Sequence, residues 1–327
     1  MSLSRLDRLV KPLVTKLQDG HMHRLGIANT MRLAHAYNRN KFRRQDEQRH
    51  RLYQNSMPEL LKENGAPSRP AVTLQDGWAL DTSLSLPHLD RVLEASDKII
   101  AEQAGQRKSA KGAYRSFFQN MMTTELLGQH PAFLDFATSS EILQTVSNYI
   151  QCVPVLSATL PAGVRLVESN MEFDDQPDVP HDSQIYHIDY YSLPNVYVLV
   201  LLRDTTIENG PWTFLPKSVS KKTSDALGYW SRRRPYRLSD DEIYSVADKK
   251  DVISFAYPRG TVLFIESSGC FHYGSRRCVK PRFQLMYGYS GACRTDFSEV
   301  IMDSIVYPKS DSDSRLRKLV LDKHRLE

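Results

Sequence analysis

Three side chains in the second half of this chain have the residue types and spacing of a metal site. His187 and Asp189 stand two residues apart, so an extended strand directs both side chains to the same face, where they can hold one ion together. His272 lies far beyond them and follows a strand-like run from Gly260 to Ile265. Two imidazoles and one carboxylate are the ligands of Fe(II) centres that activate dioxygen and keep exchangeable positions open.

The pair His187 and Asp189 is a weak signal by itself, because the chain has ten histidines. The ordered elements that follow the pair strengthen it. They are an apolar strand (Val196 to Leu202), a turn (Asn209-Gly210-Pro211), a second strand (Trp212 to Leu215), Pro216-Lys217-Ser218, the run from Gly260, His272 and Arg282.

With these elements in this order, residues 70 to 295 resemble the phytanoyl-CoA dioxygenase-like branch of the Fe(II)/2-oxoglutarate-dependent oxygenases. The resemblance implies a mainly β fold with supporting helices, built on a double-stranded β-helix (a cupin-like jelly roll). It also implies Fe(II) held by His187, Asp189 and His272, 2-oxoglutarate as co-substrate, and dioxygen. Lys217 and Val219 stand where the family usually carries glycine and histidine, and neither position is a metal ligand.

Arg282 is the residue we expect to anchor the distal carboxylate of 2-oxoglutarate, because a guanidinium binds a carboxylate through two parallel hydrogen bonds. Gln284 stands where many relatives place a small hydroxyl, and its amide can also donate a hydrogen bond. The resemblance places further co-substrate contacts before and just after the metal-binding pair. The candidates there are Thr159, Gln184 and Tyr190.

The expected reaction is hydroxylation of an unactivated C–H bond in a small metabolite, with release of succinate and CO2. Relatives that halogenate generally lack the carboxylate ligand, which Asp189 supplies here. Tyr191 and Trp212 are candidate substrate contacts, although packing is the commoner role of such residues. Arg232, Arg233 and Arg234 lie in an insertion at about 217–251 and are candidates to bind an anionic group of the substrate, although most charge runs are solvated.

Two other functions stay open at this point. A cupin-type metal enzyme without a co-substrate usually has more histidines and a glutamate, whereas this chain offers His187 and Asp189. A non-catalytic, metal-binding relative of the same fold is the second alternative, and an intact ligand set argues against it.

Composition indicates a soluble globular protein, with 41% hydrophobic and 25% charged residues among 327. No apolar stretch approaches the roughly 20 residues of a membrane-spanning helix, and the N-terminus lacks the features of a secretory signal. We therefore expect a cytoplasmic protein. The four cysteines form no C-x-x-C pair, which argues against zinc and favours reduced thiols.

Residues 1–70 form a basic, mostly helical extension, with fourteen Lys or Arg against six Asp or Glu, before an oxygenase domain over 71–327 that ends in a short helix. Apolar residues between Leu3 and Leu17 recur at helical spacing. This segment predicts a helix packed on the barrel or on a second subunit, or a peripheral contact with a membrane surface. Nucleic-acid binding is not expected, because no module for it accompanies the charge.

Further helices are predicted over Leu86 to Gln103, residues 114–127, and Ser139 to Tyr149. Eight short strands with turn signals between them suit the jelly roll that the resemblance implies.

Overall fold

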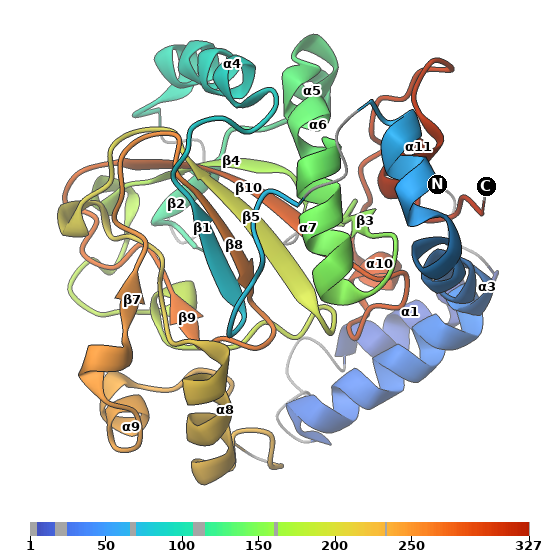
Figure 1. Cartoon of the computed structure of the whole chain (residues 1–327). Helices are drawn as coiled ribbons and strands as arrows, with labels where there is room; N and C mark the ends of the chain where they lie inside the picture. The colour runs from blue at the N-terminus through green and yellow to red at the C-terminus, as the bar shows by residue number, and fades with distance from the viewer. Residues whose placement is uncertain are drawn as a thin grey trace.

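The two longest strands lie side by side in the larger of two antiparallel sheets (Figure 1). The computed structural model describes residues 5–16, 25–65, 70–106, 115–159, 163–232 and 234–326. In it β5 (Asn195–Leu201) pairs along its whole length with β10 (Arg282–Ser290). The order of the larger sheet is β1-β8-β5-β10-β4-β2, and β3 also pairs with β10. The other strands of this sheet are β1 (Trp78–Asp81), β2 (Phe118–Asn120), β3 (Val155–Leu156), β4 (Arg165–Ser169) and β8 (Val262–Glu266).

The smaller sheet has three short strands in the order β7-β6-β9. These are β6 (Thr213–Phe214), β7 (Ile253–Ser254) and β9 (His272–Tyr273). From β5 to β10 the chain passes repeatedly between the two sheets. Two antiparallel sheets connected in this way form a double-stranded β-helix, or jelly roll, so the fold class expected from the sequence is confirmed.

Strand β5 shows why the sheets stack, because alternate side chains leave its opposite faces. Tyr197, Leu199 and Leu201 point to the inner face and pack with Trp212 and Phe214 of the smaller-sheet side. The intervening valines, Val196, Val198 and Val200, belong to a second cluster with the helices. Since both faces of β5 are buried, its sequence is an almost continuous apolar run.

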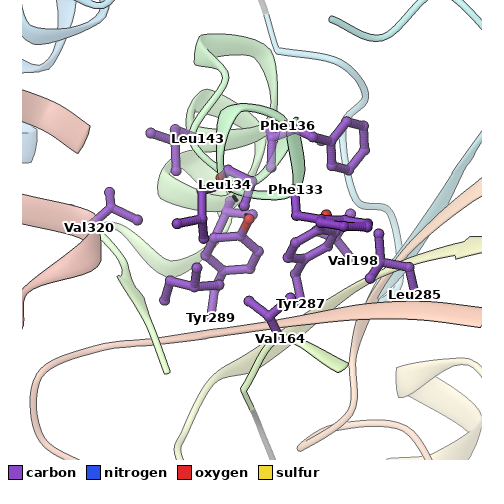
Figure 2. Close-up of a cluster of buried hydrophobic side chains, with 14 of the residues drawn as sticks. Phe133, Leu134, Phe136, Leu143, Val164, Val198, Leu285, Tyr287, Tyr289 and Val320 are labelled. Atoms are coloured by element: carbon purple, nitrogen blue, oxygen red, sulfur yellow. Dashed lines mark hydrogen bonds between the residues drawn. The ribbon is translucent and has the colours of Figure 1, made fainter. Parts of the chain in front are cut away.

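Helices cover the outer face of the larger sheet (Figure 1). Figure 2 shows Phe133 and Leu134 packing over Tyr287 and Tyr289, which project from β10. The hydroxyl of Tyr289 donates a hydrogen bond to the carbonyl of Ala137 (2.7 Å). The helices of this layer are α4 (Leu89–Gln103), α5 (Thr124–Gln129), α6 (Ala132–Ala137), α7 (Ser140–Ile150) and α11 (Arg315–Leu321).

The insertion after β6 carries two helices, α8 (Lys217–Ala226) and α9 (Asp240–Tyr244). A last short helix, α10 (Ser298–Ile301), follows β10. Single turns of 3₁₀ helix stand at Met171–Phe173, Asp182–Gln184, Ile207–Asn209 and Lys249–Asp251. No helix within the described ranges is both long enough and apolar enough to cross a membrane.

The helix predicted over residues 114–127 is wrong for its described part, which starts at residue 115. Phe118 to Asn120 form β2 at the edge of the larger sheet, paired with β4. The helix α5 starts only after Thr123, whose hydroxyl accepts a hydrogen bond from the Leu126 amide (3.2 Å). Pairing with a distant strand overrides the helical pattern of this segment.

The N-terminal region contributes α1 (Arg5–Lys16) and the long helix α3 (Ile27–Glu63). Leu52, Leu60 and Leu61 of α3 belong to the same apolar cluster as the outer face of the sheet. In α1, Val14 is buried against α3 and α10, whereas Leu9 and Leu13 are exposed. Residues 1–4, 17–24 and 66–69 lie outside the described part, and with them the ends of the predicted apolar stripe.

Arg49 joins α3 to the C-terminal helix. Its guanidinium is buried and donates to the carbonyls of Val153 (3.3 Å), Pro154 (3.1 Å), Leu319 (2.6 Å) and Asp322 (2.9 Å). Burial lowers the pKa of Arg49 to about 10. Two of these carbonyls lie at the end of α11, where helix carbonyls lack intrahelical partners, so one side chain of α3 satisfies acceptors from two other segments.

Replacing Arg49 with methionine is therefore expected to lower the free energy of unfolding by about 3 kcal/mol, because buried carbonyls lose their donor. Urea unfolding measures this change. The exposed neighbour Arg51 is the control, since Arg51→Met should stay within about 0.5 kcal/mol of the parent. Equal effects of the two substitutions would show that Arg49 does not hold these segments together.

Candidate metal and co-substrate site

The three candidate ligands come from chain segments that lie side by side. His187 and His272 exchange backbone hydrogen bonds, with the amide of His187 donating to His272 (3.1 Å) and the amide of His272 donating to His187 (2.9 Å). The amide of Asp189 donates to the carbonyl of Ser267 (3.0 Å). This pairing brings the two imidazole rings to a centroid distance of 4.4 Å.

The ligand atoms of the three residues converge. Nε2 of His187 lies 3.9 Å from one carboxylate oxygen of Asp189, and Nε2 of His272 lies 3.8 Å from the other. One donor atom from each residue lies within 4.8 Å of the others, and all three residues are buried. Donors that bind one ion at about 2.1 Å are at most about 4.2 Å apart, so small adjustments close this cluster around a single metal.

Backbone carbonyls fix the orientation of both imidazoles. Nδ1 of His187 lies 2.8 Å from the carbonyl of Ile185, and Nδ1 of His272 lies 2.9 Å from the carbonyl of Cys270. Because a carbonyl only accepts, Nδ1 carries the proton in each ring and Nε2 keeps its lone pair toward the cluster. Metal-binding histidines are oriented by partners of this kind.

Burial lowers the pKa of both histidines below their ordinary value of 6.5, and for His187 the neighbouring His272 lowers it further. The folded protein therefore holds both rings neutral, which is the form that binds a metal. It keeps them neutral at pH values where the unfolded chain already takes up protons.

This difference predicts how the stability of the metal-free protein depends on pH. Below pH 6.5 the unfolded state binds more protons than the folded state, so the free energy of unfolding falls as the pH falls. Each neutral histidine contributes up to about 1.4 kcal/mol per pH unit. Urea unfolding between pH 7.5 and 5.5 should show a shallower slope for His272→Gln than for the parent protein. Equal slopes for the parent and His272→Gln would contradict the lowered pKa.

Arg282 reaches the same cavity, which has a volume of about 60 Å³ and contains His187, Asp189 and His272 in its wall. One terminal nitrogen of Arg282 donates to the hydroxyls of Ser169 (3.2 Å) and Ser275 (3.0 Å), and the other donates to the carbonyl of Gly210. Its Nε is buried without a hydrogen-bond partner in the described part of the chain.

Arg282 has no acidic partner within ion-pair distance among the residues that the structure describes. It is only 5% exposed, and burial lowers its pKa. Asp189 is the sole carboxylate among the described residues that line the cavity. A buried cation without a counter-ion is costly, and a carboxylate ligand would supply the missing charge through a paired, hydrogen-bonded contact.

Two of the predicted substrate contacts line this cavity, Tyr191 and Trp212. The ring of Trp212 lies over that of His272, with centroids 4.5 Å apart. A side chain at Gly274 would come within 2.6 Å of Trp212, so the glycine permits this close packing. Trp212 thus packs against one face of the His272 ring.

Other predicted residues are placed differently. Gln284 points to the inner face of β10, as Arg282 does, but is not part of the cavity wall. Both polar atoms of its amide are buried and have no hydrogen-bond partner among the described residues. The amide of Gln184 donates to Asp174 and to the carbonyl of Ser275 (both 3.0 Å). Tyr190 packs edge-on against Tyr236. Thr159 lies in another cavity, beside Ser304.

Neither Arg232 nor Arg234 lines this cavity. Arg232 is exposed, and Arg234 pairs with Glu242 (2.9 Å). Arg233 lies outside the described residues.

Sequence reasoning missed six polar or charged residues among the described residues of the cavity wall. The hydroxyls beside Arg282 belong to Ser169 and Ser275, and Ser169 stands opposite Arg282 in the β4–β10 ladder. This pairing register of β4 with β10 is the only feature that identifies Ser169 as a neighbour of Arg282. The six residues are Arg115, Arg165, Ser169, Ser183, Ser275 and Tyr197.

No family model matches the sequence, and no curated protein matches it. Among solved structures, the chain is similar to EctD from S. alaskensis, determined with 2-oxoglutarate and 5-hydroxyectoine, with 13% identity, 77% of this chain and 86% of that chain covered, and a TM-score of 0.46. It is also similar to the epimerase SnoN in complex with Fe³⁺, alpha ketoglutarate and nogalamycin RO. That match has 14% identity and a TM-score of 0.42, and it covers 79% of this chain and 97% of SnoN. A third similar structure is that of the carbocyclase SnoK from nogalamycin biosynthesis. That match has 12% identity and a TM-score of 0.39, and it covers 72% of this chain and 85% of SnoK. These values are too low to assign an activity, and the fold assigned above rests on the sheet topology.

Proposed function

We propose that this protein is an Fe(II)- and 2-oxoglutarate-dependent dioxygenase that hydroxylates an unactivated C–H bond of a small metabolite. One observation carries the proposal. A buried cluster of two neutral imidazoles and one carboxylate shares a small cavity with a buried guanidinium that has no acidic partner among the described residues.

The donor set fits the ion. Two histidines and one carboxylate on one face form the triad of non-haem Fe(II) oxygenases, whereas sites for Mg²⁺ or Ca²⁺ are built from oxygen ligands. His187, Asp189 and His272 would hold the iron. When bound, Fe(II) with 2-oxoglutarate and dioxygen supplies oxidation of a C–H bond, with release of succinate and CO2.

The protein's own residues orient the co-substrate and exclude water. Arg282 binds the distal carboxylate, and the hydroxyls of Ser169 and Ser275 hold the guanidinium in place. The carbonyls of Ile185 and Cys270 keep both imidazoles in the metal-binding tautomer. Trp212 and Tyr197 cover the site with apolar surface, which strengthens the charge interactions within it.

Conversion of 2-oxoglutarate to succinate without a primary substrate tests the proposal. We expect succinate to form when Fe(II), oxygen and the protein are all present, and omission of any one of them should abolish it. A non-catalytic relative would bind Fe(II) and 2-oxoglutarate without forming succinate. A cupin-type enzyme without a co-substrate would not bind 2-oxoglutarate at Arg282.

A further inference from the structure

A second group of polar side chains lines the cavity away from Arg282. In the β4–β10 ladder Arg282 stands opposite Ser169, whereas Arg165 stands opposite Met286. Arg165 and Ser169 are four residues apart on β4, about 13 Å along a strand. Both side chains leave the inner face, with Val167 between them, and all three residues line the cavity. The two arginines therefore reach the cavity wall from strand positions about 13 Å apart.

Arg165 is buried, at 7% exposure, yet its side chain forms no hydrogen bond or ion pair with any described residue, and its Nε is enclosed without a partner. The other buried arginines differ. Arg294 pairs with Asp296, Arg49 donates to four carbonyls, and Arg282 donates to two hydroxyls and one carbonyl. An enclosed guanidinium without acceptors is costly, so the position of Arg165 points to a ligand.

Two tyrosines add hydrogen-bond donors to the same cavity. Tyr197 is 2% exposed and Tyr191 is 9% exposed, and neither hydroxyl has a hydrogen-bond partner among the described residues. A tyrosine hydroxyl keeps its proton at neutral pH, so both groups can act as donors. Arg165, Tyr191 and Tyr197 thus offer donors to a ligand that brings acceptors.

The charges indicate which ligand this is, and this step rests on the proposed function. A divalent metal ion and the negative charge of the Asp189 carboxylate together leave one positive charge in the site. The guanidinium of Arg282 contributes a second positive charge. The two carboxylates of 2-oxoglutarate neutralise both. Two further arginines line the wall, and one of them, Arg115, already pairs with Asp182. Arg165 is therefore the arginine that is left without a counter-ion.

We infer that Arg165, Tyr191 and Tyr197 bind an anionic group of the primary substrate, a carboxylate or a phosphate. This contact fixes one end of the substrate within the cavity that holds the metal ligands, so that a neighbouring C–H bond faces the iron. The inference replaces the arginine run of the insertion, 232–234, as the receptor of an anionic substrate.

The test uses protein loaded with redox-inert Zn(II) and saturated with 2-oxoglutarate, so that Arg282 is already occupied. Trifluoroacetate is the anionic probe, followed by ¹⁹F NMR relaxation, and trifluoroethanol is the neutral control probe. We expect the parent protein to bind trifluoroacetate in preference to trifluoroethanol. Arg165→Met should weaken this binding by about tenfold or more, since a charge-assisted contact is lost.

Two further variants make the result specific. Tyr197→Phe removes only a hydroxyl and should weaken trifluoroacetate binding by about threefold to tenfold, so the inference can be judged even where Arg165→Met fails to fold. Arg165→Lys keeps the charge and should restore part of the binding. Binding of trifluoroacetate that is the same in the parent, Arg165→Met and Tyr197→Phe would overturn the inference.

Titrations of 2-oxoglutarate and 2-oxobutyrate, which lacks the distal carboxylate, decide where the anion comes from. We expect Arg165→Met to change neither affinity by more than about threefold. An equal, larger loss for both keto acids would assign Arg165 to the co-substrate and overturn the inference. If the parent protein binds trifluoroacetate through Arg165 but fails to bind 2-oxoglutarate, the anion site stands and the proposed function fails.

Discussion

Replacing His187 with alanine is expected to lower Fe(II)-dependent succinate formation by about 10³-fold or more, because partners that only orient a metal ligand already contribute 10- to 100-fold. The substitution leaves His272 and Asp189, which are too few protein ligands to retain the ion. Succinate release measured by mass spectrometry and the iron content of the purified protein should fall together.

A control for this prediction is His130→Ala, since His130 lies near the start of α6 and outside the cavity wall. Its iron content and succinate release should match those of the parent. Retention of both by His187→Ala would remove the metal assignment.

Replacing Arg282 with methionine is expected to raise the KM for 2-oxoglutarate by about 100-fold, because truncating one partner of a buried, hydrogen-bonded charge pair costs about 2–5 kcal/mol. The same substitution should change the KM for 2-oxobutyrate far less, since that keto acid has no distal carboxylate. The parent enzyme should therefore prefer 2-oxoglutarate strongly, and the variant should lose most of that preference.

The control is Arg277→Met, which removes an exposed guanidinium from the loop that precedes β10. Its KM for 2-oxoglutarate should stay within a factor of about 2 of the parent. A similar rise in the KM for both keto acids in Arg282→Met would show that the side chain supports the fold and does not read the distal carboxylate.

Local sequence spacing predicted part of the site. His187 and Asp189 are two residues apart, so an extended backbone places them together whatever the rest of the fold does. Arg282 was found because a guanidinium that follows the distal histidine matches the order of elements in a known family. The hydroxyls beside Arg282 were sought two residues away, at Gln284, whereas Ser169 supplies one from across the β4–β10 ladder.

Strand register explains why Arg165 was missed. It is one of many arginines in the sequence, and only the pairing of β4 with β10 shows that it shares the inner face with Ser169. Strand pairing also explains the error at β2. Its sequence pattern predicts a helix, whereas its residues pair with β4 at the edge of the larger sheet. Arg49 is a further example, because its acceptors lie beyond residue 150.

The most direct test of the central claim is an anaerobic crystal structure of the protein with Fe(II) and 2-oxoglutarate, with the metal located by anomalous scattering. The anomalous peak should lie between Nε2 of His187, Nε2 of His272 and the carboxylate of Asp189. The distal carboxylate of 2-oxoglutarate should contact Arg282. A peak elsewhere, or a co-substrate bound away from Arg282, would contradict the assignment of this cavity as an oxygenase site.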